Sequence, residues 1–211
     1  LVPSLTGESQ LRPIVGPDSV LTALGPRHMR QRKLLLPAFH GKAIERYSAM
    51  IESVIDREIE RWPVGRRFAL APRMQSVTLD VILAGVFGID DRPPAGGAED
   101  RLRRAISWLI GVSTLPGAKL VELMNLGSER PIGLLRAAMA RVDRAIYPVI
   151  AARRTDPRLE QRDDIMSMLL RAETEDGQLL TDTELRNELL TLLLAGHETT
   201  ANQLAWTWER L

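Results

Sequence analysis

Residues 181–200 read Thr-Asp-Thr-Glu-Leu-Arg-Asn-Glu-Leu-Leu-Thr-Leu-Leu-Leu-Ala-Gly-His-Glu-Thr-Thr, and this stretch decides the fold class. Thr181 lies three residues before Glu184, the spacing of a capping box, in which hydroxyl and carboxylate satisfy each other's backbone N–H groups at a helix start. About 30 residues follow without proline, which corresponds to a helix of about 45 Å. Five leucines between positions 189 and 194 cover nearly every side of such a helix. The sequence therefore predicts one long, central, buried helix over 182–211.

Helical periodicity also covers most of the remaining chain, so the predicted fold class is mainly α. In addition to 182–211, the predicted helices are 27–36, 42–61, 73–87, 98–111, 133–154 and 162–172, with at most a short helix at 19–24. β-branched residues leave a strand as an alternative only at 77–87. The stretch 90–97, which contains proline and glycine, is predicted to be a surface loop that joins helices rather than domains.

Length and composition limit the class of protein. The 211 residues suffice for one domain, and 45% hydrophobic with 26% charged residues is the balance of a folded chain. With 28 basic and 27 acidic residues the formal net charge is +1, too even for binding nucleic acid by bulk charge. The absence of cysteine excludes disulfides, a thiol nucleophile, cysteine-ligated zinc and an iron–thiolate bond within these residues.

The apolar stretches and the two ends of the sequence indicate where the protein is located and whether the sequence is a piece of a longer chain. The most apolar candidate, 105–118, is too short for a membrane span and contains a proline. The sequence opens without a start methionine or a signal-peptide layout and closes inside the predicted last helix. We therefore interpret it as an internal piece of a longer protein, which we expect to be cytoplasmic.

Small and hydroxyl-bearing residues share one face of the predicted last helix. At about 100° per residue, Ala195 and Thr199 are close in azimuth, with Gly196 and Thr200 beside them. This face leaves room for something flat, and the glycine and the threonines favour local widening of the helix. Glu198 flanks the face. The alternative is a buried helix whose threonines bond to preceding carbonyls and whose Glu198 pairs with a neighbouring arginine, and spacing alone weighs the two equally.

His197 and Glu198 also begin the H-E-x-x-H pattern of zinc proteases. That pattern needs a second histidine one turn later, and the position is occupied by Ala201. His28 and His40 offer no spacing that repairs the pattern, and His197 points away from the face described above. We therefore predict no metal ligand in this chain.

The segment 195–200, placed on a long helix behind a capping box, resembles the central I helix of the cytochrome P-450 family of haem-thiolate monooxygenases. Gly-Pro-Arg-His-Met-Arg-Gln-Arg-Lys at 25–33, with Pro-Ala-Phe at 37–39, is similar to the family's C helix. Residues 78–88 resemble its E helix, and 163–170 resemble the segment before the I helix. The resemblance covers nearly the whole chain, from the B–C region to the I helix. It implies that 1–211 is a partial domain without the N-terminal region, the K helix and the cysteine loop.

The resemblance assigns a cofactor role to two residues of the predicted C helix. His28 and Arg32 are one helical turn apart, and cationic donors at that spacing suit the carboxylate of a haem propionate. The alternative is a solvated basic face, since Arg27, Arg30 and Lys33 lie in the same stretch. The same cluster could present positive charge to an acidic redox partner, with Arg30 and Lys33 setting the association rate. Nucleic acid is not an expected partner, because no aromatic residue is interleaved with these charges.

The resemblance also assigns roles along the predicted last helix. Ala195 and Gly196 would pack against the oxygen-binding side of haem b. Thr199 and Glu198 would be catalytic and would steer protons to bound dioxygen, because cleavage of the O–O bond requires protons that a hydroxyl can relay. Thr200 is assigned to packing or substrate contact. In this scheme the iron oxidises, while the protein positions and protonates.

The function implied is insertion of one oxygen atom of O2 into a small hydrophobic substrate, with electrons from a ferredoxin or a reductase. The apolar segments 5–24 and 108–126 fall where the family contacts substrate, although a core-facing role explains the same residues. The iron ligand would lie downstream of residue 211, and we predict that the fragment alone is inactive. Glu58 and Arg61 have the E-x-x-R spacing of the K helix but lie far upstream, so we attribute that match to chance. The alternative function is a non-catalytic helical remnant that binds a ligand or a partner.

Overall fold

The structure is a computed structural model, and it describes residues 9, 11–89, 93–174 and 177–210. Its α-helices are α1 (Arg12–Val15), α2 (Gly25–Leu35), α3 (Lys42–Ile59), α4 (Leu70–Gly85), α5 (Ala98–Ser113), α6 (Ala118–Met124), α7 (Gly133–Arg154), α8 (Ile165–Arg171), α9 (Asp182–Gly196) and α10 (Glu198–Arg210). Short 3-10 helices are η2 (Leu36–Phe39) and η3 (Leu159–Gln161). Within the described ranges there is no β-strand, only an isolated bridge between Glu173 and Leu179. The predicted mainly α class is confirmed.

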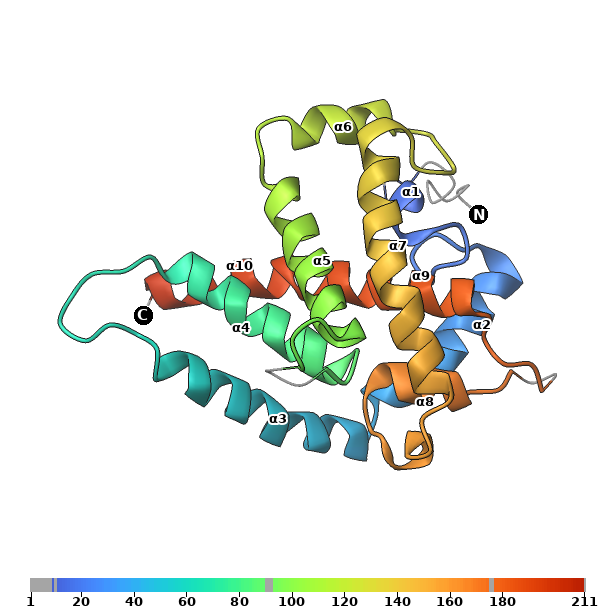
Figure 1. Cartoon of the computed structure of the whole chain (residues 1–211), viewed down its shortest axis with the longest axis horizontal. Helices are drawn as coiled ribbons and strands as arrows, with labels where there is room; N and C mark the ends of the chain where they lie inside the picture. Colours follow the sequence, from blue (N-terminus) through green and yellow to red (C-terminus); the bar gives the residue numbers. More distant parts are fainter. Residues whose placement is uncertain (1–8, 10, 90–92, 175–176, 211) are drawn as a thin grey trace.

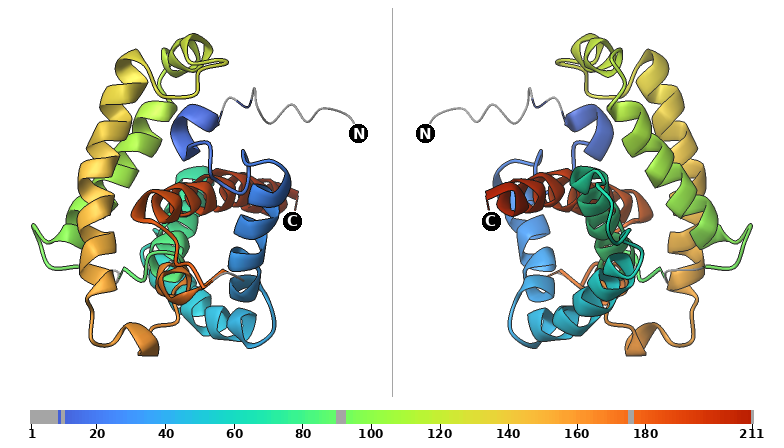
Figure 2. Two further views of the ribbon diagram at one scale, coloured as in Figure 1. Left: turned by 90° about the vertical axis from the view of Figure 1, so that its right-hand side faces the viewer. Right: turned by 90° about the vertical axis from the view of Figure 1, so that its left-hand side faces the viewer.

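Helices α9 and α10 follow one another through the middle of the molecule, with the other helices arranged around them (Figure 1). Helix α4 packs along α10, and α3 lies against α4. Helices α5 and α7 form an antiparallel pair that contacts α9 through α7, with α6 near their upper ends. Figure 2 shows this pair and α2 on opposite sides of the α9–α10 axis. The predicted central position of the last helical segment is therefore confirmed, but its predicted burial holds only for α9, since Ala201 is the one buried residue of α10 in the described part of the chain.

The hydrophobic core lies where α9 meets the helices that cross it. Leu189 of α9, Leu83 of α4, Ile106 of α5 and Ile146 of α7 are all 0% exposed and belong to one cluster. Each such side chain contributes about 1.5–3 kcal/mol when it leaves water. Because the core surrounds α9, its position relative to the neighbouring helices is fixed by packing.

Most of the predicted helices are present. The predicted range 133–154 coincides with α7, and the segment 77–87 is largely helical within α4 and forms no strand, so the strand alternative is wrong. The short helix expected at 19–24 is absent, and that stretch forms turns. There Thr22 Oγ1 donates to the Gly16 carbonyl and the Leu21 N–H donates to Ser19 Oγ, bonds that compete with a helix.

Other differences are confined to connections. Helix α6 was not predicted, although it falls in the apolar segment 108–126. Of the predicted loop 90–97, residues 90–92 lie outside the described part, and 93–97 are non-helical as expected. The two last helices replace the single helix expected over 182–211. No helix in the described part of the chain is both long and apolar enough to cross a membrane.

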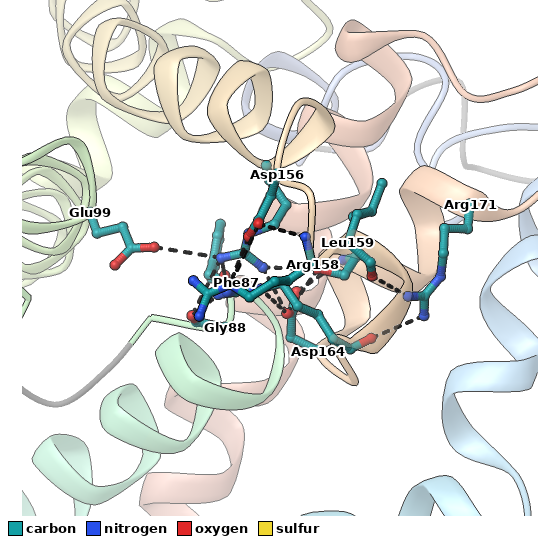
Figure 3. A network of polar contacts seen from close by, with 11 residues as sticks. Phe87, Gly88, Glu99, Asp156, Arg158, Leu159, Asp164 and Arg171 are labelled. Atoms are coloured by element: carbon teal, nitrogen blue, oxygen red, sulfur yellow. Dashed lines mark hydrogen bonds and ion pairs between the residues drawn. The ribbon is translucent and has the colours of Figure 1, made fainter.

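A buried arginine joins the end of α7 to the start of α8. Arg153 Nη1 donates to Asp164 Oδ2 over 2.7 Å and to Ser167 Oγ over 2.9 Å, and Nη2 donates to the Phe87 carbonyl over 3.0 Å. Asp164 is also the N-cap of α8, accepting from the Ser167 N–H. Figure 3 shows Phe87, Gly88 and Asp164 converging on this point, with Glu99 approaching from α5. The network fixes α7, α8 and the end of α4 together around one charge.

Candidate functional site

The segment 195–200 lies at a break between two helices. Helix α9 ends at Gly196, His197 is helical in neither element, and α10 begins at Glu198. Thr199 Oγ1 donates to the Ala195 carbonyl four residues earlier. A hydroxyl that bonds to the preceding turn is a recognised cause of helix distortion. The prediction of one continuous helix is therefore wrong, although the glycine and the threonines that favoured local widening lie at the break.

The helix start, in contrast, is as predicted. Thr181 Oγ1 accepts from the Glu184 N–H over 3.2 Å, and Glu184 Oε2 accepts from the Thr181 N–H over 3.0 Å. Hydrogen bonds from Thr181 hold the pKa of Glu184 below its usual value, even though burial acts in the opposite direction as the largest single effect. The capping box is confirmed.

One side of the break is open. Ala195, Glu198, Thr199 and Thr200 are exposed, and the expectation that the acid and the hydroxyls are enclosed by protein is wrong for the described residues. Glu198 forms no ion pair with any described residue, so its predicted alternative partner, a neighbouring arginine, is absent there. Thr199 does bond back to a carbonyl, as the alternative expected. The open side presents a methyl group, two hydroxyls and a carboxylate.

The other side of the break is closed by α4. His197 is 5% exposed, and its Nδ1 lies 3.0 Å from Thr78 Oγ1. Burial lowers the pKa of His197, so the ring is neutral at ordinary pH. A Cβ atom on Gly196 would lie 2.6 Å from Ile82 Cδ1, which explains the glycine by close approach of α4. Gly196 and His197 therefore lie against α4, as predicted for the histidine, whereas the prediction that Gly196 shares the face of Ala195 and Thr199 is wrong.

Helix α2 holds the two predicted propionate ligands. His28 is half-buried, and its Nδ1 lies 2.9 Å from the Val20 carbonyl. A carbonyl only accepts, so Nδ1 carries the proton and Nε2 remains for another partner. Arg32 is exposed and has no hydrogen bond or ion pair with the described residues. Both side chains thus keep donor capacity that the described fold does not use.

The rest of the basic stretch on α2 is engaged differently. Arg30 donates to Glu184 Oε1 over 2.6 Å and is half-buried, and Arg27 pairs with Asp18 over 2.6 Å. The fully solvated basic face is therefore wrong for Arg30. An open cavity of about 1020 Å³ is lined by Arg27, Arg30 and Lys33 together with Glu184, and neither His28 nor Arg32 lines it. Arg27, Arg30 and Lys33 thus line this cavity, whereas His28 and Arg32 lie outside it.

The sequence interpretation missed a carboxyl group that docks the 19–22 turn on α9. Glu188 is 0% exposed, and its Oε1 accepts from the Val20 N–H over 2.8 Å. Burial raises the pKa of Glu188 to about 8, and Oε2 has no hydrogen-bond partner. Beside it, Ser19 Oγ and Thr191 Oγ1 are 2.6 Å apart. The signal that could have found Glu188 is an acid inside the leucine run of a buried helix.

Of the apolar segments assigned to substrate contact, the part that contains α6 is exposed. In 115–126 several large hydrophobic side chains are exposed, and they are Leu115, Leu120, Leu123, Met124 and Leu126. These side chains therefore take no part in the core formed by the described residues. The other segment, 5–24, lies partly outside the described residues.

Comparison with known proteins gives one consistent result. The family model described as cytochrome P450 matches residues 9–210. A Mycobacterium tuberculosis protein that carries the name cytochrome P450 137 is 40% identical over 200 residues, covering 94% of this chain and 41% of that protein. A second, cytochrome P450 138 of Mycobacterium bovis, is 38% identical over 205 residues, covering 97% of this chain and 45% of that protein. The chain thus spans less than half the length of these relatives.

Solved structures agree with these relatives. A cyanobacterial cytochrome P450 bound to retinoic acid superposes with a TM-score of 0.68 at 25% identity, covering 92% of this chain and 42% of that one. A mutant haem domain of cytochrome P450DA gives a TM-score of 0.71 at 25% identity, covering 96% of this chain and 44% of that one. The arrangement of helices around α9 and α10 is therefore shared with solved proteins over nearly all of this chain.

Proposed function

Because the chain belongs to the cytochrome P450 family, we propose that residues 1–211 form the oxygen-activating half of a haem-dependent monooxygenase. The reaction would insert one oxygen atom of O2 into a small hydrophobic substrate, with electrons from a redox partner such as a ferredoxin or a reductase. The observation that carries the proposal is the helix break at His197, where Thr199 bonds to the Ala195 carbonyl on an open face.

The described residues suit a flat group that bears carboxylates. His28 keeps Nε2 for a partner outside the described fold, and Arg32 keeps its guanidinium. Since Nδ1 already donates to Val20, Nε2 can donate to a carboxylate only when the ring is protonated, which makes the contact a charged one. We assign His28 and Arg32 to a haem propionate. Ala195 would contact the ring face through its methyl group, whereas Gly196 would act by letting α4 approach the helix break closely.

Bound haem supplies the oxidising chemistry, and this chain supplies proton control. Thr199 donates its own proton to the Ala195 carbonyl, so the oxygen lone pairs remain to accept a hydrogen bond from a group on the open face. Glu198 is exposed and adjacent in sequence, which lets its carboxyl exchange protons with solvent. Thr199 would hold an oxygen-bearing group by accepting a hydrogen bond from it, and the Glu198 carboxyl would supply the proton. Thr200 is assigned to substrate contact on the same face.

Substitution of Thr199 by alanine in the haem-loaded full-length protein tests this assignment. We expect substrate-dependent electron consumption to continue while a large part of the electrons leaves as hydrogen peroxide instead of hydroxylated product. Thr207→Ala is the matched control, because Thr207 Oγ1 makes the same bond to a carbonyl four residues earlier, that of Gln203, further along α10. A Thr199→Ala enzyme that couples electrons to product as well as the Thr207→Ala control refutes the relay.

The iron ligand would come from outside these residues, because the chain has no cysteine. We therefore expect the purified 211-residue chain to lack the red-shifted ferrous–carbon monoxide spectrum of a thiolate-ligated haem and to hydroxylate nothing. Hydroxylation by that chain without an added polypeptide overturns the proposal.

A further inference from the structure

The backbone of Val20 links α9 to the histidine assigned to the haem propionate. Its N–H donates to Glu188 Oε1 over 2.8 Å, and its carbonyl accepts from His28 Nδ1 over 2.9 Å. These groups lie in the two planar peptide units that meet at the Val20 Cα, so one residue connects a carboxyl group inside the core to an imidazole ring at the edge of the proposed cofactor site. Residue 188 and residue 28 have no other connection of this kind among the described residues.

Burial of the Glu188 carboxyl group costs free energy, and core packing alone does not require a carboxyl group at this position. Its side chain is 0% exposed and one carboxyl oxygen has no partner, whereas a leucine would fill the position without unsatisfied polar atoms. No arginine is paired with it, and the acidic groups of Glu184 and Asp18 are the charges that influence it. The one described hydrogen bond that this carboxyl group accepts is the one from Val20.

We propose that Glu188 is a positioning residue for His28, acting through the backbone of Val20. This inference rests on the proposed role of His28 as a propionate ligand. The hydrogen bond from the Val20 N–H to Glu188 holds residue 20 in place on α9, and the Val20 carbonyl then fixes the ring plane of His28. Nε2 is thereby held toward the group that it binds, in the way that an outer hydrogen-bond partner orients a ligating histidine.

Two substitutions test whether the carboxyl group of Glu188 acts as the hydrogen-bond acceptor for the Val20 N–H. Glu188→Gln keeps a carbonyl oxygen for the Val20 N–H in nearly the same volume, and Glu188→Leu removes the acceptor. Glu188→Met is the second apolar variant if the leucine variant does not fold. Thr191→Val is the control. It loses the contact with Ser19 in the same turn but leaves the two backbone hydrogen bonds of Val20 in place.

The first measurement is the rate of haem transfer from the haem-loaded full-length protein to excess apomyoglobin. We expect Glu188→Leu to lose haem about tenfold faster than wild type, the scale of one misplaced charged hydrogen bond. The glutamine variant and Thr191→Val should stay within about twofold of wild type on the same scale. In a His28→Phe background, Glu188→Leu should add nothing, because the residue it positions is gone.

The second measurement is the ¹⁵N chemical shift of the His28 ring in the diamagnetic ferrous–carbon monoxide state, assigned by its loss in His28→Phe. We expect both ring nitrogens to carry protons in wild type and Glu188→Gln, with Nδ1–H bonded to the Val20 carbonyl, and a changed Nδ1 shift in Glu188→Leu, where that carbonyl is no longer held in place. Equal effects of Glu188→Leu with and without His28, or an unchanged ring, overturn the positioning role. A His28→Phe protein that keeps haem as well as wild type overturns the propionate assignment instead, while the ring shift still decides whether Glu188 positions His28.

Discussion

Replacement of Arg153 by methionine should lower stability by about 4 kcal/mol, because one partner of a buried ion pair is removed. The Arg153 and Asp164 side chains are 3% and 6% exposed and 2.7 Å apart. Methionine keeps most of the volume, so the loss comes from removal of the shorter ion pair of the buried Asp164 and from the Phe87 carbonyl that Arg153 also binds. Among the described residues Asp164 then keeps only Arg162, at 3.4 Å, as a cationic partner. With a urea slope of about 2.5 kcal/mol/M, the midpoint of unfolding should fall by about 1.5 M.

The neighbouring arginine provides the control for that measurement. Arg154 pairs with Asp182 over 2.6 Å, but the two side chains are 34% and 49% exposed. Exposed pairs contribute at most about 1 kcal/mol, so Arg154→Met should shift the urea midpoint by about 0.4 M or less. Urea unfolding of both variants is followed by circular dichroism. Equal shifts of the two midpoints would refute the claim that burial makes the Arg153 contacts between α7 and α8 the stronger ones.

Three further predictions follow from single groups. Because the pKa of Glu188 is raised from 4.5 to about 8, its contribution to stability is complete below pH 4.5 and is lost as the pH rises through 8, so Glu188→Gln should reduce this loss in urea titrations at several pH values. Gly88 has φ +61° and an added Cβ would lie 2.4 Å from Asp164 Oδ2, so Gly88→Ala should lower the thermal midpoint by several degrees. Thr181→Ala should cost about 1 kcal/mol by urea unfolding, whereas Thr183→Ala, which lies outside the capping box, should cost little.

Local patterns predicted the elements well. Helix α7 begins and ends where its apolar period does, because the spacing of Met139, Val142, Ile146 and Val149 builds a core-facing stripe regardless of its neighbours. The capping box at Thr181 was equally visible, since both partners lie within one turn. Information of this kind is contained in a window of a few residues.

Contacts between distant residues could not be predicted from such windows. Val20 and Glu188 are 168 positions apart, and Arg153 and Phe87 are 66 apart. Each contact depends on how whole helices pack, and a backbone carbonyl or N–H carries no residue-specific signal. The sequence does show that an acid in a buried helix needs a partner, but it does not show which backbone group provides it.

The segment 195–200 shows why spacing alone could not choose between packing and chemistry. Gly196 and His197 close against α4, through Ile82 and Thr78, so substitutions there should act on stability. Glu198 and Thr199 are exposed and contribute little to the core, so their substitution should leave the unfolding midpoint near that of wild type and act on coupling. Packing therefore accounts for Gly196 and His197, while the chemical role of Glu198 and Thr199 stays a prediction, because successive positions of a helix point about 100° apart and a short motif can serve both.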